Sequence, residues 1–215
     1  MNTETDFSRS FDFGWISSES GKHHRYTYPA IFDELARSGA KRVIDIGSGN
    51  GVLCKILHDR GYDVVGVEYD ISGVQVARES FPEISFYNYK VEDDPAILLE
   101  DELSAFYCII STEVIEHLFA PHLLVEYAAK VMGRNGTLII TTPYHGYWKN
   151  LLLSIGGRWD HHLEPFWLGG HIKFWSRRTL TDFLIQNGFD VIRFRGVGRL
   201  PLIWKGMVIT ARKRG

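Results

Sequence analysis

The sequence predicts an α/β protein built on a doubly wound sheet of seven strands, mostly parallel, with an antiparallel hairpin at the C-terminal end. Short β-branched strands alternate with helices from about residue 40 onward. Strands such as "RVIDI" and "TLIIT" are apolar at successive positions, which is typical of a parallel sheet covered by helices on both faces. The last two strands follow each other across a turn with glycine and proline, which indicates a hairpin.

The elements follow in a regular order. A first helix is expected over residues 28–39, where apolar residues recur at helical spacing and Gly39 supplies a C-cap. The parallel strands are expected at Arg42–Ile46, Asp63–Glu68, Ile84–Tyr89, Ala105–Ser111 and Thr137–Thr141. The helices between them are expected at Gly51–Arg60, Ser72–Ser80, Pro95–Leu103 and Leu123–Met132. A helix over 176–189, with Ser176 as N-cap and Gly188 as C-cap, then leads into strands at 189–196 and 204–212.

Composition limits the class of protein. The chain has 215 residues, suited to one domain, and 45% of them are hydrophobic. The net charge of −2 does not favour a polyanion as partner. The apolar stretches are short for a membrane span, the N-terminus does not resemble a signal peptide, and Cys54 and Cys108 are expected as packed thiols. These features favour a cytoplasmic protein, and they leave its oligomeric state open.

The chain is expected to divide into an arm or lid, residues 1–27, and one domain, residues 28–215. Within that domain, residues 142–175 form a long insertion between the fifth strand and the helix at 176. The insertion is rich in aromatic residues and histidine. Such side chains stack on a planar ring, a sugar face or a nucleobase, so the insertion is expected to cap the substrate. Its apolar run also leaves open a peripheral contact with a membrane.

The segment "VIDIGSGNG", residues 43–51, is a strand that runs into three glycines at alternate positions. Glycines allow a ligand to approach the backbone closely, and Glu68 at the end of the next strand suits the hydroxyls of a ribose. No lysine–serine or lysine–threonine pair follows the glycines, which excludes a phosphate-binding P-loop. Asp45 would repel a pyrophosphate, so the loop suits a ligand with a cationic centre.

This loop resembles the first motif of the class I S-adenosylmethionine (SAM)-dependent methyltransferases, and the resemblance extends from about residue 40 to 212. It implies the Rossmann-like sheet of that family, with Gly47 and Gly49 beneath SAM and Glu68 on its ribose. The segment "KVEDD", residues 90–94, resembles the stretch that contacts adenine. The predicted cofactor-binding residues are Asp45, Gly47, Ser48, Gly49, Gly51, Glu68, Tyr69, Val91, Glu92, Asp93 and Ser111.

The segment "TEVIEHLF", residues 112–119, has three possible interpretations. Glu113 caps a helix while Glu116 and His117 are structural, or His117 acts as a general base. In the third, two carboxylates and an imidazole hold a divalent cation such as Mg²⁺, Mn²⁺ or Zn²⁺. The order of the strands places this segment, as a loop or short helix, at the carboxyl edge of the sheet, where ligands bind.

The segment "EVIEHL" resembles a motif of two methyltransferase branches, the ubiquinone-biosynthesis O-methyltransferases and the small-RNA 3′-terminal 2′-O-methyltransferases. In the RNA branch a further histidine binds the metal, and "GGHIKFW" places His171 at that position, with Ile172 as an insertion. The predicted metal ligands are Glu113, Glu116, His117 and His171. His117 or His145 is expected to take the proton of the acceptor.

The sequence therefore favours a SAM-dependent O-methyltransferase (EC 2.1.1) of a small molecule, such as a catechol-like compound, a quinone precursor or a sugar with two neighbouring oxygens. Methylation of an RNA 3′ end is the second hypothesis, disfavoured because the whole chain is slightly acidic. A SAM-binding partner protein without catalysis is the third. Turnover separates the last from the first two, and salt dependence separates RNA from a small acceptor.

Overall fold

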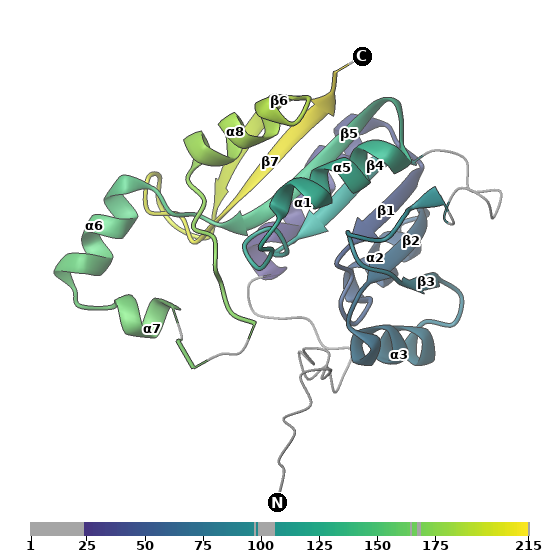
Figure 1. The fold of residues 1–215 in the computed structure, drawn as a ribbon, viewed down its shortest axis with the longest axis horizontal. Coiled ribbons are helices and arrows are strands. Elements are labelled where there is room, and N and C mark those ends of the chain that lie inside the picture. Colours follow the sequence, from purple (N-terminus) through teal and green to yellow (C-terminus); the bar gives the residue numbers. More distant parts are fainter. Residues whose placement is uncertain (1–23, 97, 99–105, 164, 167–168, 215) are drawn as a thin grey trace, which may run out of the picture.

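A computed structural model describes residues 24–96, 98, 106–163, 165–166 and 169–214 (Figure 1). One seven-stranded sheet forms its centre, in the order β3-β2-β1-β4-β5-β7-β6. The strands are β1 (Arg42–Ile46), β2 (Asp63–Glu68), β3 (Ser85–Asn88), β4 (Phe106–Thr112), β5 (Met132–Pro143), β6 (Phe189–Val197) and β7 (Gly206–Lys213). Strands β1 to β5 pair in parallel, and β7 pairs antiparallel to both β5 and β6. The predicted fold class is confirmed.

Helices cover both faces of the sheet. On one face lie α1 (His24–Ser38), α2 (Val52–Asp59) and α3 (Ile71–Ser80), and on the other lie α5 (Pro121–Val131) and α8 (Arg177–Gln186). Successive strand residues point to opposite faces, so Val43 joins the core under α1 to α3 while Ile44 joins the core under α5 and α8. This two-sided burial explains why the strands are continuously apolar in sequence.

Some elements differ from the predicted bounds. Helix α1 begins at His24 rather than at residue 28, because Thr27 and Tyr28 are buried and belong to the helix. Strand β5 begins at Met132 rather than Thr137, through a stretch in which Asn135 has a φ of 61°. The predicted helix at Pro95–Leu103 and the predicted arm at 1–27 lie mostly outside the described residues.

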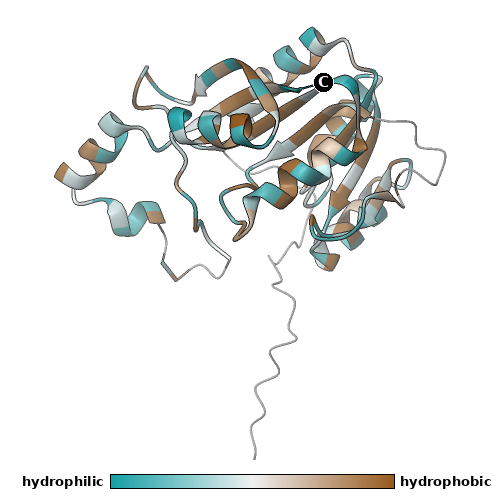
Figure 2. Ribbon diagram, turned by 45° about the horizontal axis from the view of Figure 1, so that its top comes forward, coloured by the Kyte–Doolittle hydropathy of each residue, from teal (hydrophilic) through white to brown (hydrophobic). Residues whose placement is uncertain are grey.

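The insertion at 142–175 contains two short helices, α6 (Tyr147–Ile155) and α7 (Trp159–Leu163). Both project from the body of the sheet (Figure 1), and α6 carries several apolar positions, drawn in brown in Figure 2. Within the described ranges, no helix has the length and apolar character needed to cross a membrane. Trp167 of the insertion lies outside those ranges, and the cytoplasmic location stays a prediction.

The strand order reverses between β1 and β4, because the chain runs outward from β1 through β2 to β3 and then returns to β4 and β5. In open α/β sheets, ligands bind at the carboxyl ends of the strands at such a reversal. The glycine loop after β1 and the "TEVIEHLF" segment after β4 meet there. A Cβ on Gly47 would overlap the side chain of Val114, so the two segments are in direct contact.

Candidate functional site

The glycine loop turns away from β1 through three residues in the left-handed region. Gly47, Gly49 and Gly51 have φ values of 81°, 53° and 78°, which residues with a Cβ rarely adopt. The backbone N–H groups of Gly47 and Ser48 both donate to the carbonyl of Val67 on β2, at 2.8 and 3.0 Å. The sequence places glycine at these positions because the backbone itself requires it.

Glu68, the last residue of β2, holds this loop through its side chain. Its Oε2 accepts from the N–H of Gly49 at 2.8 Å, and its Oε1 accepts from the N–H of Asp70 at 2.9 Å. Burial raises the pKa of this carboxyl. The side chain of Asn88, on β3, donates to the carbonyls of Glu68 and Tyr69. Glu68 is thus fixed at the carboxyl edge beside the glycine loop, where a ribose acid is expected.

Asp45 lies on β1 and faces helix α2. The thiol of Cys54 lies 3.6 Å from its Oδ2 and donates to it, whereas Oδ1 is buried with no hydrogen-bond partner in the described part of the chain. Burial raises the pKa of Asp45 to about 7. The predicted attraction for a cationic ligand therefore depends on a carboxyl group that titrates near neutral pH.

The remaining predicted cofactor residues lie along the same edge of the sheet. Ser111 is buried near the end of β4, and its hydroxyl donates to the carbonyl of Ile46 at 2.9 Å. Val91, Glu92 and Asp93 follow β3, where Asp93 accepts from the N–H of Lys90 in a tight turn. Strand β3 is parallel to β2, so this turn lies at the edge that Glu68 also occupies.

The segment after β4 is a turn and not a helix. Its first residue, Glu113, has a φ of 55°, a left-handed conformation that costs energy for a residue with a side chain. The hydroxyl of Thr141 on β5 donates to Oε1 of Glu113 at 2.8 Å, and burial raises the pKa of this carboxyl to about 7. Strained residues of this kind gather at ligand sites.

Glu116 is the most enclosed acid of the segment, with 1% of its surface exposed. Neither carboxylate oxygen has a hydrogen-bond partner among the described residues, although Nε2 of His171 lies 3.9 Å from Oε1. Burial, and then the neighbouring Glu113, raise the pKa of Glu116 well above its usual range. A buried carboxyl group without hydrogen bonds is costly, so this side chain suits a cation.

Two histidines complete a cluster around Glu116. One potential ligand atom each from Glu116, His117 and His171 lies within 4.8 Å of the others. Nδ1 of His117 donates to the carbonyl of Gly169 at 2.6 Å, because a carbonyl can only accept. Histidines that bind metals commonly donate their second ring N–H to a carbonyl in this way. The N–H groups of Ile172 and Lys173 donate to the carbonyl of Glu116, which brings His171 to the site.

The structure thus brings together three of the four predicted metal ligands. Glu113 is close enough to raise the pKa of Glu116, yet its own carboxylate is engaged by Thr141. Thr141 is a contributor that the sequence did not indicate, because its role arises from the parallel pairing of β4 with β5.

His145 follows β5, and its backbone N–H donates to the carbonyl of Trp175 at 2.9 Å. Its ring is buried, with neither nitrogen hydrogen-bonded within the described ranges. The ring lies 5.2 Å from that of His162 and 5.0 Å from that of Phe174, measured between centroids. Burial, and then the charge of Lys149, lower the pKa of His145 to about 3, so the imidazole is neutral at pH 7.

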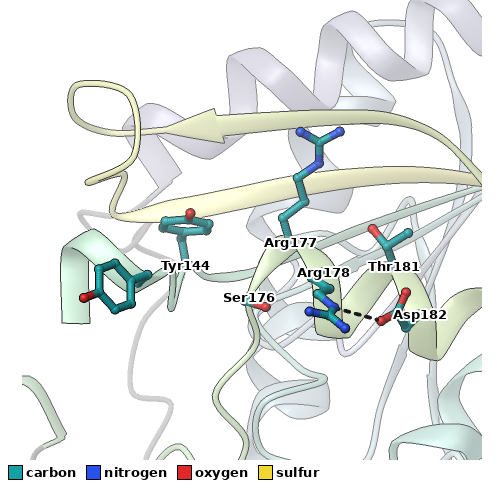
Figure 3. Close-up of a pocket in the computed structure, with 8 residues that line it drawn as sticks. Tyr144, Ser176, Arg177, Arg178, Thr181 and Asp182 are labelled. Atoms are coloured by element: carbon teal, nitrogen blue, oxygen red, sulfur yellow. Dashed lines mark ion pairs between the residues drawn. The ribbon is translucent and has the colours of Figure 1, made fainter. Parts of the chain in front are cut away.

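A cavity of about 390 Å³ lies elsewhere, at the N-terminus of α8 (Figure 3). It is lined by Tyr144, Gly146, Tyr147, Ser176, Arg177, Arg178, Thr181 and Asp182. Arg178 pairs with Asp182 at 3.7 Å, and the guanidinium of Arg177 lies 4.8 Å from the ring centre of Phe194. Both cations are engaged within the fold, and no predicted site residue lines this cavity.

A model of the family described as "Methyltransferase domain" matches residues 21–193. The ubiquinone biosynthesis O-methyltransferase of Hahella chejuensis is 26% identical over 177 residues, which make up 80% of this chain and 73% of that protein. The chain spans only 65% and 64% of two relatives of the same name, from Bartonella tribocorum and Bradyrhizobium diazoefficiens, each 28% identical.

Two solved structures share the fold. Magnesium protoporphyrin IX methyltransferase from Synechocystis PCC 6803, with bound SAH, has a TM-score of 0.66 at 17% identity, over 89% of this chain and 83% of that chain. The methyltransferase domain of bacterial CtHen1 has a TM-score of 0.62 at 21% identity, over 86% of this chain and 97% of that chain. At these identities the likeness concerns the fold alone.

Proposed function

The chain belongs to the methyltransferase domain family, and from that premise we propose that it transfers the methyl group of SAM to an oxygen of a small acceptor molecule. The family match confirms the resemblance inferred from the sequence. The names of the relatives, ubiquinone biosynthesis O-methyltransferases, support oxygen as the atom that is methylated. The observation that carries the proposal is the contact between the glycine loop and the segment that contains Glu116, because a cofactor bound at the loop would then adjoin an acceptor bound at that segment.

The cofactor site is proposed at the ends of β1, β2 and β3. Gly47 and Gly49 would pass beneath SAM, and Glu68 would accept hydrogen bonds from its ribose, since each carboxylate oxygen can accept more than one. Val91 to Asp93 would border the adenine, and Ser48, Gly51, Tyr69 and Ser111 would complete the wall. Asp45, behind the loop, would act on the sulfonium through its charge.

The acceptor site is proposed at the ends of β4 and β5. Glu116, His117 and His171 are chemically suited to a divalent cation, and Glu113 is placed to join them if Thr141 releases it. When bound, such a cation would lower the pKa of an acceptor hydroxyl. The side chains themselves would orient two neighbouring oxygens, which matters because alignment of acceptor and methyl carbon is the main task of the enzyme.

His145 is proposed as the proton acceptor. Its ring is neutral at pH 7 and buried, and its loop leads from β5 into the insertion. Because burial and the charge of Lys149 lower its pKa to about 3, the bound acceptor would have to offset that charge for the ring to take up the proton. Residues 142–175 would then form the substrate cap of a methyltransferase domain that spans residues 28–215, with residues 1–27 as a lid. Exposed apolar side chains on this cap, at Tyr147, Leu152, Ile155 and Phe166, would suit a peripheral contact with a membrane.

Calorimetric titration of Mg²⁺, Mn²⁺ and Zn²⁺ into the SAM-loaded protein tests the acceptor site. We expect micromolar binding of at least one ion, weakened at least ~10-fold in Glu116→Gln and in His171→Ala because each removes one ligand. Glu126→Gln and His122→Ala are matched controls, since both residues are exposed on α5 and outside the cluster. Catechol is then the first acceptor to be tried for turnover.

If none of the three ions binds, the metal is no longer part of the proposal. Glu116, His117 and His171 would then have acid–base or structural roles. The acceptor screen would then open to single hydroxyl groups. SAM binding without turnover of any acceptor would instead favour a partner protein without catalysis.

Methylation of an RNA 3′ end remains a second candidate, and the approach of His171 to Glu116 is the observation that favours it. Affinity for a short RNA would fall steeply as salt rises, because phosphate contacts release counterions. Affinity for a neutral small acceptor would not.

A further inference from the structure

Helix α6 buries a charged side chain and exposes apolar ones, the reverse of an ordinary amphipathic helix. Its sequence is YWKNLLLSI, and Lys149 is its one buried residue, with 5% of its surface exposed. Leu152 and Ile155, by contrast, are 54% and 75% exposed. Burial of an ammonium group costs free energy unless a partner compensates it, whereas burial of leucine would be favourable. This arrangement indicates that the position of Lys149 has a purpose other than packing.

The Lys149 ammonium lies at the carboxyl edge of the sheet. Its Nζ donates to the carbonyl of Lys205 at 3.3 Å, the one hydrogen bond of this group within the described ranges. The same carbonyl accepts from the N–H of Tyr144 at 3.1 Å, just beyond the point where β5 pairs with the start of β7. An ammonium carries three N–H donors, so this group has donors to spare in a buried place.

A second cation acts on Lys149. The charge of Arg199 acts on Lys149 and on Tyr26, and Nζ of Lys205 lies 5.5 Å from the ring centre of Tyr26. The carboxylate of Glu113 also acts on Lys149. Burial and Arg199 together lower the pKa of Lys149 to about 8, so the group is mostly charged at pH 7. Lys149 and Arg199 therefore bring positive charge to the acceptor side of the sheet edge.

We propose that Lys149, assisted by Arg199 and the hydroxyl of Tyr26, binds an anionic group of the acceptor, a carboxylate or a phosphate, next to the oxygens that Glu113 and Glu116 face. The inference rests on the proposed function, since it describes the acceptor of that same site. It narrows the acceptor to a molecule with an anionic substituent in addition to the reacting hydroxyl. Lys149 acts by binding and orienting this acceptor.

The competing explanation is that Lys149 serves only as the counterion of Glu113. That role would not distinguish between acceptors. The two explanations therefore differ in how a substitution of Lys149 affects an anionic probe relative to a neutral one.

Calorimetry with the SAH-loaded protein, which cannot turn over, makes this comparison. The probes are catechol, 3,4-dihydroxybenzoate and 3,4-dihydroxyphenylphosphonate, which differ in whether they carry no anion, a carboxylate or a phosphonate. We expect at least one anionic probe to bind about 10- to 100-fold more tightly than catechol. In Lys149→Met this ratio falls to about 1. Lys130→Met, an exposed lysine on α5, leaves the ratio unchanged.

The tighter-binding of the two anionic probes shows whether the acceptor carries a carboxylate or a phosphate. Equal binding of all three probes to the wild-type protein overturns the proposal. So does a Lys149→Met variant that weakens all probes by one common factor, because that result identifies a counterion. If Lys149→Met does not fold, Arg199→Met at the surface replaces it, with a smaller expected fall in the ratio of about 3-fold.

Failure of the proposed function itself has a different outcome. If catechol and both of its derivatives fail to bind, the vicinal-oxygen acceptor class is wrong. Benzoate and phenyl phosphate then test the subsite alone. If either probe binds and Lys149→Met abolishes that binding, the protein has an anion subsite without a catechol site. If neither probe binds, the anion subsite is overturned.

Discussion

Glu68 and Glu116 are both buried glutamates at the carboxyl edge of the sheet, one on the cofactor side and one on the acceptor side. Each oxygen of Glu68 accepts a backbone N–H, from Gly49 and Asp70. Neither oxygen of Glu116 has a hydrogen-bond partner within the described ranges. Glu68 is therefore satisfied by the backbone around it, whereas Glu116 has buried oxygens that a ligand would satisfy.

The same contrast separates the helices of the two sides. Helix α3, on the cofactor side, has Asp70 as its N-cap, with the carboxylate accepting from Ser72, and it buries Val74 and Ala77. Helix α6, on the acceptor side, buries Lys149 and exposes Leu152 and Ile155. Buried polar side chains that serve a ligand lower the free energy of unfolding, whereas buried apolar side chains raise it. The acceptor side therefore has the lower stability of the two. Four substitutions test this contrast.

The largest effect is expected where the two sides touch. Gly47→Ala should lower the free energy of unfolding by about 2–4 kcal/mol, since the new Cβ meets both a left-handed φ of 81° and the side chain of Val114. Urea denaturation measures this value. Val114→Ala in the same chain should recover the part due to overlap but not the part due to φ.

Gly61→Ala is the matched control, because Gly61 has a φ of 82° and its Cβ would meet nothing within 4 Å. It should cost only the conformational part, about 1–2 kcal/mol. If Gly47→Ala is no less stable than Gly61→Ala, the glycine loop is not packed against the segment that contains Val114.

Asp45 and Ser48 are exceptions on the cofactor side, because Oδ1 of Asp45 and Oγ of Ser48 are buried without a hydrogen-bond partner in the described part of the chain. The pKa of Asp45 is raised from 3.8 to about 7, so the folded protein keeps this proton between pH 4 and 7 whereas the unfolded chain loses it. The folded state thus binds more protons in this window, and stability falls as pH rises. Asp45→Asn removes that fall.

Relative to the wild-type protein, Asp45→Asn should gain about 1–3 kcal/mol in free energy of unfolding as the pH rises from 4 to 7. Urea denaturation at several pH values measures it. Asp190→Asn, an exposed residue on β6, serves as control. A difference that does not vary with pH would contradict the raised pKa.

The smallest effects have opposite signs. Glu68→Gln should destabilise by about 1–2 kcal/mol, because an amide N–H replaces an acceptor that faces a backbone donor. Glu116→Gln should stabilise the metal-free protein by about 1 kcal/mol at pH 7, because the buried wild-type carboxyl must take up a proton on folding whereas the amide is always neutral. Denaturation in the presence of a chelator compares them, with the exposed Glu126→Gln as reference. Two variants with the same sign would end the contrast drawn above.

Much of the fold followed from the sequence because β-branched runs and glycine caps act locally. Strand β5 was harder, since its first residues, Met132 to Gly136, contain two glycines and Asn135 and do not look like a strand. Met132 pairs with Phe106 of the neighbouring β4, and residues 133–136 lie in the irregularity of that pairing before Thr137. That pairing is a tertiary effect that local pattern does not reveal.

The site was predictable to the extent that residue types imply chemistry. Glu116, His117 and His171 do gather, although His171 lies far along the chain. The bond between Glu113 and Thr141 was not foreseen, because it depends on strand register. Lys149 was also missed. A lone cation in the apolar run YWKNLLLSI was the available signal, but only packing against the Lys205 loop decides which way the helix faces.

The contact between Gly47 and Val114 also has a thermodynamic consequence. If the cofactor shifts the glycine loop by even a fraction of an ångström, Val114 must follow, and the turn that carries Glu116 moves with it. Linkage then requires reciprocity: whatever factor the first ligand adds to the affinity of the second, the second adds to the first. Cooperativity between the two sites would thus be set by one glycine and one methyl group.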